Sequence, residues 1–226
     1  MVKLTINGKA IEVPEGLTVL EAARSIGIEI PTLCYHEAVK PYGACRLCVV
    51  EITSKTPSEL ASSCTLPVQE RMKIETDSEE VLEARRFIVE LLLARSPNVE
   101  KIKELALQLG VKKPRFELEE DDCILCGLCA RICREVVGVG AISLVERGFE
   151  RDVKPPLETP SNACIGCGTC VYVCPTGALK LEEIEPVKAI HNWDLDFEIR
   201  KCKVCGDDHF YEFPKDYKKF LSFEES

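Results

Sequence analysis

The chain opens with apolar and polar side chains that alternate over two short runs. Val2 to Ile6 and Lys9 to Val13 both have this period of two, and Asn7-Gly8 between them is typical of a two-residue hairpin turn. Thr18 and Glu21 then form a capping-box pattern at the start of an apolar stripe of helical spacing. The pattern therefore predicts a β-hairpin followed by a helix.

Helical spacing of apolar residues returns in the middle of the chain. Asp77 or Ser78 can cap a first helix, and a second is predicted from about Asn98 to Leu109. Apolar stripes of this kind usually pack in a core, so we interpret both helices as a spacer with no binding role. The stripe of the first helix consists of Val81, Leu82, Phe87, Ile88, Leu91 and Leu92.

The second half contains an internal repeat from Cys123 to Leu181. Each copy has a cysteine loop, a short helical segment, a glycine-containing turn and a short apolar segment. Arg147 to Pro160 lies between the copies and is expected to be an ordered but irregular loop, because it holds three prolines and is too short to separate domains.

Cysteines carry the most specific chemical signal. The chain has 14, and twelve of them fall into three runs. The last two runs repeat C-x2-C-x2-C-x3-C, in which one loop presents three thiolates to an iron–sulfur cluster while the fourth reaches a neighbouring cluster. The first run has gaps of 10, 2 and 15 residues, a stretched form of the plant-type pattern, with Gly43 placed for close backbone approach.

These spacings predict one 2Fe–2S cluster and two 4Fe–4S clusters. Pro175 follows Cys174 as the bacterial pattern expects, but Arg134 follows Cys133, so the second ligand exchange is supported by spacing alone. Zinc ligation or simple packing is the alternative for the first run. The predicted ligands are Cys34, Cys45, Cys48 and Cys64 for 2Fe–2S, Cys123, Cys126, Cys129 and Cys174 for the first 4Fe–4S cluster, and Cys164, Cys167, Cys170 and Cys133 for the second.

A smaller constellation lies near the end of the chain. Cys202, Cys205 and His209 have the spacing of half a zinc knuckle, and His191 is the candidate fourth ligand. A fourth ligand supplied by a partner subunit is the alternative. A zinc ion here would hold together a tail too small to fold alone.

Charge and composition narrow the class of protein. The chain has 38 acidic and 29 basic residues, a formal charge of -9, which disfavours nucleic acid as a partner. Its longest apolar stretch, Ile88 to Ala94, is interrupted by Glu90 and is far shorter than the roughly 20 residues of a membrane span. The first residues lack an apolar signal core, so we expect a reducing, cytoplasmic location. A disulfide framework is the alternative, but closely repeated C-x-x-C suits metal ligation better.

The expected fold class is α+β. A β-grasp 2Fe–2S ferredoxin domain is predicted over residues 1–76, a helical spacer over 77–116, a bacterial-type two-cluster 4Fe–4S ferredoxin domain over 117–185, and a metal-binding tail over 186–226. No phosphate-binding loop, dinucleotide-binding glycine motif or Ser-His-Asp order is present, so the chain is not expected to be an enzyme on its own.

Three groups of residues carry a resemblance to a known family. They are Ile30 to Tyr35 with Gly43 to Cys48, Cys123 to Cys133, and Ala163 to Cys170 with Cys174 to Leu179. The chain resembles the iron–sulfur electron-transfer subunit of NAD(P)-linked hydrogenases, especially electron-bifurcating ones, and of formate dehydrogenases. It is also similar to the N-terminal part of the complex I large iron–sulfur subunit.

The resemblance implies an electron relay between a flavin subunit that handles NAD(P)H and a catalytic subunit, either a hydrogenase or a formate dehydrogenase. Soluble ferredoxin is a further candidate partner.

Two departures from the family pattern limit the comparison. Ser96 to Phe116 has no Cys or His, so the additional cluster of most relatives is missing, and the chain stops at Ser226, so catalysis is expected in another subunit. A free-standing polyferredoxin and a zinc scaffold remain alternatives.

Overall fold

The computed structural model describes residues 1–116, 118, 120–155, 163–184, 187–190, 195–201 and 208–211. The chain divides into two compact units, Met1–Cys126 and Gly127–Ser226. Each unit is described by itself below.

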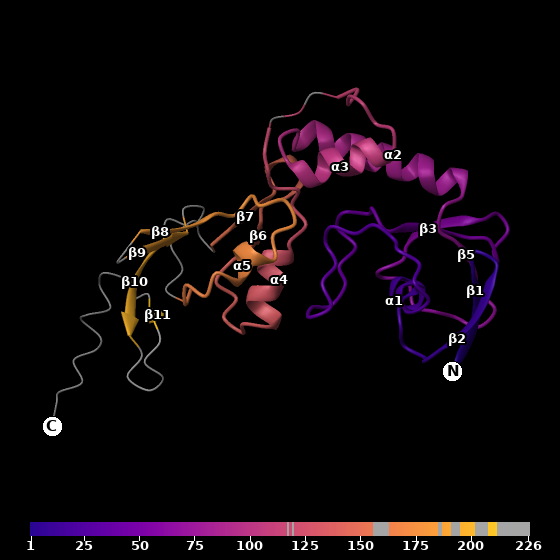
Figure 1. The fold of residues 1–226 in the computed structure, drawn as a ribbon, viewed down its shortest axis with the longest axis horizontal. Helices are drawn as coiled ribbons and strands as arrows, with labels where there is room; N and C mark the ends of the chain where they lie inside the picture. Colours follow the sequence, from indigo (N-terminus) through magenta and orange to yellow (C-terminus); the bar gives the residue numbers. More distant parts are fainter. Residues whose placement is uncertain are drawn as a thin grey trace. The chain divides into compact units, whose positions relative to one another are not determined.

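The first unit is built on a mixed five-stranded sheet with the order β2-β1-β5-β3-β4. β1 and β5 are parallel, and the other neighbours are antiparallel. The predicted hairpin is confirmed, because β1 pairs with β2 through a turn in which Asn7 and Gly8 both have positive φ angles. The strands are β1 Val2–Ile6, β2 Lys9–Val13, β3 Val49–Ile52, β4 Glu59–Ser62 and β5 Lys73–Glu75 (Figure 1).

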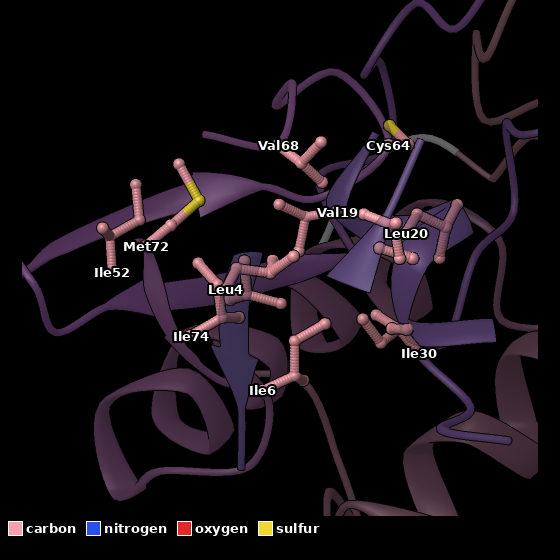
Figure 2. Packing of buried hydrophobic residues seen from close by; sticks show 14 of the residues in the cluster. Leu4, Ile6, Val19, Leu20, Ile30, Ile52, Cys64, Val68, Met72 and Ile74 are labelled. Carbon is pink, nitrogen blue, oxygen red and sulfur yellow. The ribbon is translucent and has the colours of Figure 1, made fainter. Parts of the chain in front are cut away.

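Helix α1, Val19–Ser25, packs its apolar face into the core of this β-grasp unit. Its capping box is confirmed: the Glu21 amide donates to Thr18 Oγ1 at 3.3 Å, and the Thr18 amide donates to Glu21 Oε2 at 2.7 Å. Figure 2 shows part of the core, in which Leu4 and Ile74 from the sheet and Leu20 from α1 belong to one buried cluster. Cys48 and Cys64 are members of the same cluster.

Two further helices belong to the first unit, α2 at Glu79–Arg95 and α3 at Glu100–Gln108. Ser78 is the residue that caps α2, through its hydroxyl and the Val81 amide. The second helix begins two residues later than the sequence predicts and ends before Gly110, whose φ is positive.

The predicted apolar stripe of α2 is wrong in part, since Val81 is fully buried but the other five residues of the stripe are half-buried or exposed. Phe87 and Leu91 are exposed, whereas the buried residues are Val81, Arg85, Val89, Glu90, Leu93 and Ala94. The buried face includes two charged side chains that have hydrogen-bond partners, the Arg85 guanidinium and the Glu90 carboxylate. Because charged residues occupy part of this face, its apolar residues do not recur at regular helical spacing in the sequence.

The second unit begins with helix α4, Leu128–Glu135, which packs against α5, Thr169–Tyr172. Strand β6, Ser143–Val145, pairs antiparallel with β7, Asp152–Lys154, and a short 3₁₀ helix, Gly148–Glu150, joins them. The expectation of an irregular loop after Arg147 is therefore wrong for its first half. Three residues that alternate as Asp-Val-Lys are enough to pair with β6, and Pro155 follows directly.

A four-stranded antiparallel meander completes the described part of this unit, in the order β11-β10-β9-β8. Its strands are β8 Leu181–Ile184, β9 Val187–Ile190, β10 Leu195–Lys201 and β11 Asp208–Tyr211. No helix in the described ranges is both long and apolar enough to cross a membrane.

Candidate iron–sulfur centres

The first cysteine run comes together in the core of the β-grasp unit as two pairs. All four residues are buried, with at most 8% of each exposed. The Cys45 amide donates to Cys34 Sγ at 3.4 Å, the thiols of Cys34 and Cys45 are hydrogen-bonded, and so are those of Cys48 and Cys64. The four cysteines therefore form two hydrogen-bonded pairs, Cys34 with Cys45 and Cys48 with Cys64.

In the Cys48–Cys64 pair the two thiols differ in pKa. The hydrogen bond from Cys64 lowers the pKa of Cys48 to about 6, although burial acts in the opposite direction. The same hydrogen bond raises the pKa of Cys64, and a hydrogen bond to Cys34 raises that of Cys45. One sulfur of the Cys48–Cys64 pair thus becomes a thiolate easily, which is the form that binds metal.

The pairing bears on which metal the run could hold. A zinc ion needs four ligands around a single centre, whereas two irons can each take one cysteine pair. The donor set and its pairing fit a 2Fe–2S cluster.

Backbone contacts fix the position of Cys64. Its neighbour Ser63 is fully buried, donates from both its amide and its hydroxyl to the Cys48 carbonyl, and accepts from the Leu20 amide of α1. On the other side, a Cβ added to Gly43 would lie 3.2 Å from Thr65 Cγ2, and Gly43 has a φ of +70°. The loop before Cys45 therefore approaches the Cys64 segment closely, as the glycine predicts.

A polar network joins α1 to the residue after Cys34. The Tyr35 hydroxyl donates to Glu21 Oε1 at 3.2 Å, and the Arg24 guanidinium lies 4.9 Å from the centre of the Tyr35 ring. Burial opposes ionisation of Glu21, but hydrogen bonds from Thr18 and Tyr35, together with the charge of Arg24, lower its pKa below the ordinary value. Glu21 is thus held as a carboxylate that caps α1 and anchors the loop after Cys34.

The second cysteine run starts at the end of the first unit. Arg95, on the last turn of α2, donates from Nε to the Cys123 carbonyl at 2.7 Å and from Nη2 to Asp121 Oδ2 at 2.7 Å. Asp121 in turn accepts from the Cys123 amide at 2.8 Å. These two residues position Cys123 and were missed from the sequence, where they lie 26 residues apart in a segment without any metal-ligand motif.

The predicted ligands of the first 4Fe–4S cluster are divided between the units. Cys123 and Cys126 are in the first unit, and Cys129 and Cys174 are in the second. Cys126 and Cys129 are buried, while Cys123 and Cys174 are partly exposed.

The second unit brings the other four predicted ligands to one place. A single cavity is lined by Cys133, Cys164, Cys167 and Cys170, with apolar residues that include Val139, Ile142 and Ile190. Cys133 comes from the end of α4, and the other three come from the loop before α5 and its first turn. The shared cavity therefore supports the prediction that Cys133 is the fourth ligand of the cluster held by the later loop.

Cys133 and Cys174 have equivalent surroundings despite the missing proline after Cys133. The Ala141 amide donates to Cys133 Sγ at 3.3 Å, and Ala141 follows Gly140, whose φ is positive. Ala178, which follows the positive-φ residue Gly177, donates its amide to the Cys174 sulfur. The Gly-Ala turn supplies the same donor in both copies, so the Cys133 sulfur receives this hydrogen bond without a proline after the cysteine.

Hydrogen bonds also favour the thiolate of Cys174. Burial raises its pKa, but the Thr176 hydroxyl and the amides of Thr176, Ala178 and Leu179 outweigh burial and bring the pKa below the ordinary value. Such donors stabilise negative charge on a ligating sulfur.

Both loops of the repeat use left-handed residues at matching positions. Gly166 and Gly168 have φ angles of 66° and 69°, and Leu125 and Gly127 at the equivalent positions have 52° and 67°. Turns of this kind allow successive amides and cysteine side chains to face one centre, as an iron–sulfur cluster would require. Gly127 and Gly168 are also the N-cap residues of α4 and α5.

We expect Gly127→Ala to weaken the protein more than Gly168→Ala. Both substitutions force alanine into the left-handed region, at a cost of roughly 1–2 kcal/mol. A Cβ on Gly127 would also lie 3.0 Å from Leu144 Cδ1, whereas the nearest atoms to one on Gly168 are at ordinary distances of 3.6 and 3.7 Å. Loss of iron–sulfur absorbance in urea should occur at a lower concentration for Gly127→Ala, and equal midpoints would contradict the crowding at Leu144.

The predicted zinc ligands lie mostly outside the described residues. These are His191, Cys202 and Cys205. His209 is on β11, where its backbone is paired with Arg200 of β10.

Family comparisons agree with the order of the two units. Residues 1–79 match the family described as 2Fe-2S iron-sulfur cluster binding domain. Residues 117–181 and 163–207 match families described as 4Fe-4S dicluster domain. The predicted fold class, in which a 2Fe–2S ferredoxin domain precedes a 4Fe–4S ferredoxin domain, is thereby confirmed.

Curated relatives match most of the chain. It is 37% identical to NADP-reducing hydrogenase subunit HndD of Solidesulfovibrio fructosivorans, over 86% of this chain and 39% of the relative. It is 36% identical to NADPH-Fe(3+) oxidoreductase subunit alpha of Geobacter sulfurreducens, over 79% of this chain and 24% of the relative. It is 33% identical to the NADH-ubiquinone oxidoreductase 75 kDa subunit of Reclinomonas americana, over 68% of this chain and 26% of the relative.

The chain thus spans about two fifths or less of the length of these curated relatives. Among solved structures, it is similar to a chain of an NAD+-reducing [NiFe]-hydrogenase in the H2-reduced state. The TM-score is 0.68 and the sequence identity 29%, and the match covers 78% of this chain and 86% of the other. The protein is therefore an iron–sulfur protein, a homologue of subunits of NAD(P)-linked hydrogenases, NADPH-Fe(3+) oxidoreductase and NADH-ubiquinone oxidoreductase, in which a 2Fe–2S domain precedes 4Fe–4S dicluster domains.

Proposed function

We infer that this chain is an electron-transfer subunit that relays electrons through one 2Fe–2S and two 4Fe–4S clusters. The observation that carries the inference is the cavity shared by Cys133, Cys164, Cys167 and Cys170. Sharing of a fourth cysteine between duplicated loops is what two adjacent cubane clusters require. Bound clusters would each take up and release one electron, and no bond chemistry is needed from the polypeptide.

The 2Fe–2S cluster would be held by two cysteine pairs. Cys34 with Cys45, and Cys48 with Cys64, would each supply one iron with two thiolates, as their contacts support. Burial of all four residues excludes water from the sulfurs and keeps local electrostatic interactions strong.

Cys123, Cys126, Cys129 and Cys174 would hold the first 4Fe–4S cluster. The second would take Cys164, Cys167, Cys170 and Cys133. Amides in the two Gly-Ala turns would then donate to one ligating sulfur of each cluster, and such bonds raise the potential by stabilising the more negative reduced state. Cys167 is exposed, so a redox partner that docks there would have a short path for electrons to this second site.

A structural zinc ion in the tail is part of the same proposal. Cys202 and Cys205 lie in sequence between β10 and β11, and backbone pairing of Lys201 with Asp208 joins the ends of these strands close to His209. Together with His191 they would complete a four-ligand site.

The partners are proposed from the relatives. A hydrogenase subunit would perform the catalysis, since two of the relatives belong to hydrogenases that use NAD+ or NADP. A flavin subunit that handles NAD(P)H would exchange electrons with the chain in the cytoplasm, as the family resemblance implies. A formate dehydrogenase catalytic subunit is a second candidate, because the same cluster arrangement can serve either enzyme. A free-standing polyferredoxin is a third, with soluble ferredoxin as a further possible exchange partner.

Anaerobic reconstitution of the chain tests the proposal. We expect about ten iron and about ten acid-labile sulfide per chain, with EPR signals of one 2Fe–2S and two 4Fe–4S centres after reduction. The chain alone should not oxidise hydrogen or formate. A colourless protein that retains zinc in place of iron, or turnover of either substrate by the chain alone, would contradict the proposal.

A further inference from the structure

Arg85 is a buried cation behind the second cysteine pair of the β-grasp unit. It projects from α2, only 3% of it is exposed, and its Nη2 donates to the Val49 carbonyl at 2.8 Å. Val49 follows Cys48 directly at the start of β3. The guanidinium therefore lies against the backbone that carries one of the predicted iron ligands.

The charge of Arg85 is only partly balanced. Its Nη1 donates to Asp77 Oδ1 at 3.1 Å, but 62% of the Asp77 side chain is exposed, so water screens this partner. The Nε–H of Arg85 has no acceptor among the residues that the structure describes. A buried arginine with one exposed counter-ion and an unused donor is costly, and stability alone gives little reason for it.

Electrostatics connect Arg85 to the cysteine pair as well as to Asp77. Burial lowers the pKa of Arg85, and the negative charges of Asp77 and of the Cys48 thiolate act against that change. An arginine side chain remains protonated in proteins, so the positive charge persists near Cys48.

We propose that Arg85 is a positioning residue that sets the reduction potential of the 2Fe–2S site by holding a fixed positive charge beside Cys48. Reduction adds one electron, and therefore one negative charge, to the cluster. A nearby cation in a poorly solvated place favours the more negative state. The inference rests on the proposed function only in requiring that the first cysteine run binds a 2Fe–2S cluster.

A purely structural role makes different predictions. Arg85 also links α2 to β3, so its loss could loosen the site without any electrostatic effect. Asp77→Asn separates the two roles. It keeps an acceptor for the Arg85 hydrogen bond but removes the opposing negative charge, so the electrostatic role predicts a shift opposite in sign to that of Arg85→Gln.

The test is a redox titration of the 2Fe–2S EPR signal in the reconstituted full chain. For Arg85→Gln, the ratio of reduced to oxidised 2Fe–2S centre at a fixed ambient potential should fall about tenfold, equivalent to 59 mV for one electron. Asp77→Asn should raise the ratio, and Arg85→Lys should stay close to the parent protein. Arg86→Gln is the matched control, since Arg86 is the next residue but is 43% exposed and pairs with Glu79, and it should leave the ratio unchanged.

The outcomes separate this inference from the proposed function. If the parent chain lacks a 2Fe–2S signal, the cluster assignment itself fails. If the parent signal is present, an unchanged ratio in Arg85→Gln, or a fall in Asp77→Asn, overturns the role of Arg85. If Arg85→Gln fails to fold, Asp77→Asn and Arg85→Lys still decide. A higher ratio of reduced to oxidised centre in Asp77→Asn, with an unchanged ratio in Arg85→Lys, supports the electrostatic role of Arg85. Any other result overturns it.

Discussion

In a Cys133→Ala variant, we expect Cys164, Cys167 and Cys170 to become open to alkylation by iodoacetamide under anaerobic conditions. These three line one cavity with Cys133, so removal of one sulfur leaves their cluster with three ligands. Iron content should fall by about four atoms per chain. Mass spectrometry of the alkylated peptides identifies which cysteines have lost protection.

The reciprocal variant, Cys174→Ala, is the control. It should expose Cys123, Cys126 and Cys129 and leave the later loop protected, while the first cysteine run stays protected in both variants. If Cys133→Ala instead exposes Cys123, Cys126 and Cys129, each loop holds its own fourth cysteine, and the crosswise assignment is wrong.

The local parts of the fold could be predicted because their signals are local. Asn7-Gly8 between two alternating runs specifies a hairpin, and the Thr18–Glu21 capping box specifies where α1 begins. Short-range backbone chemistry decides both features, and the tertiary structure agrees with it. The cysteine repeat predicts that Cys133 shares a cluster with the later loop, and the four cysteines do line one cavity, but the ligand role itself stays a prediction.

The buried face of α2 could not be predicted in the same way. Sequence patterns assign arginine and glutamate to the solvent side of a helix, yet Arg85 and Glu90 are buried and Phe87 is exposed. Their burial depends on acceptors and donors far away in sequence, Val49 for Arg85 and Arg115 for Glu90. Arg115 and Phe116 in turn lie beside the exposed Phe87 ring, which gives that side chain neighbours without burying it.

The same limit applies to the residues that support the clusters. Arg95 and Asp121 each make one hydrogen bond to Cys123 and are joined to each other by a third, but nothing near them in sequence marks them as partners. Arg134, by contrast, stands where the bacterial pattern has a proline, and this departure leaves the assignment of Cys133 to spacing alone. The donor to the Cys133 sulfur comes from the Gly140-Ala141 turn and not from the residue after the cysteine, so this hydrogen bond does not depend on a proline.

The 2Fe–2S site depends on the hydrophobic core as directly as on its ligands. Cys48 and Cys64 belong to the same buried cluster as Leu20, and the Leu20 amide donates to the Ser63 carbonyl at 3.1 Å. A change that loosens the core around α1 should therefore release the cluster without touching a sulfur.

We expect Leu20→Ala to cost about 2–5 kcal/mol, because Leu20 is fully buried and the surrounding core closes a cavity of this kind only in part. Loss of the 2Fe–2S signal in urea should move down by roughly 1 M or more. Leu107→Ala removes the same atoms from a leucine of α3 that is 77% exposed, and should change the midpoint little. The second unit holds its own cavity and cysteines, so the signal of the cluster at Cys133, Cys164, Cys167 and Cys170 should persist in Leu20→Ala after the 2Fe–2S signal has gone. Simultaneous loss of both signals would mean that the two units unfold together, and equal midpoints for the two leucine variants would mean that the core does not hold the cluster.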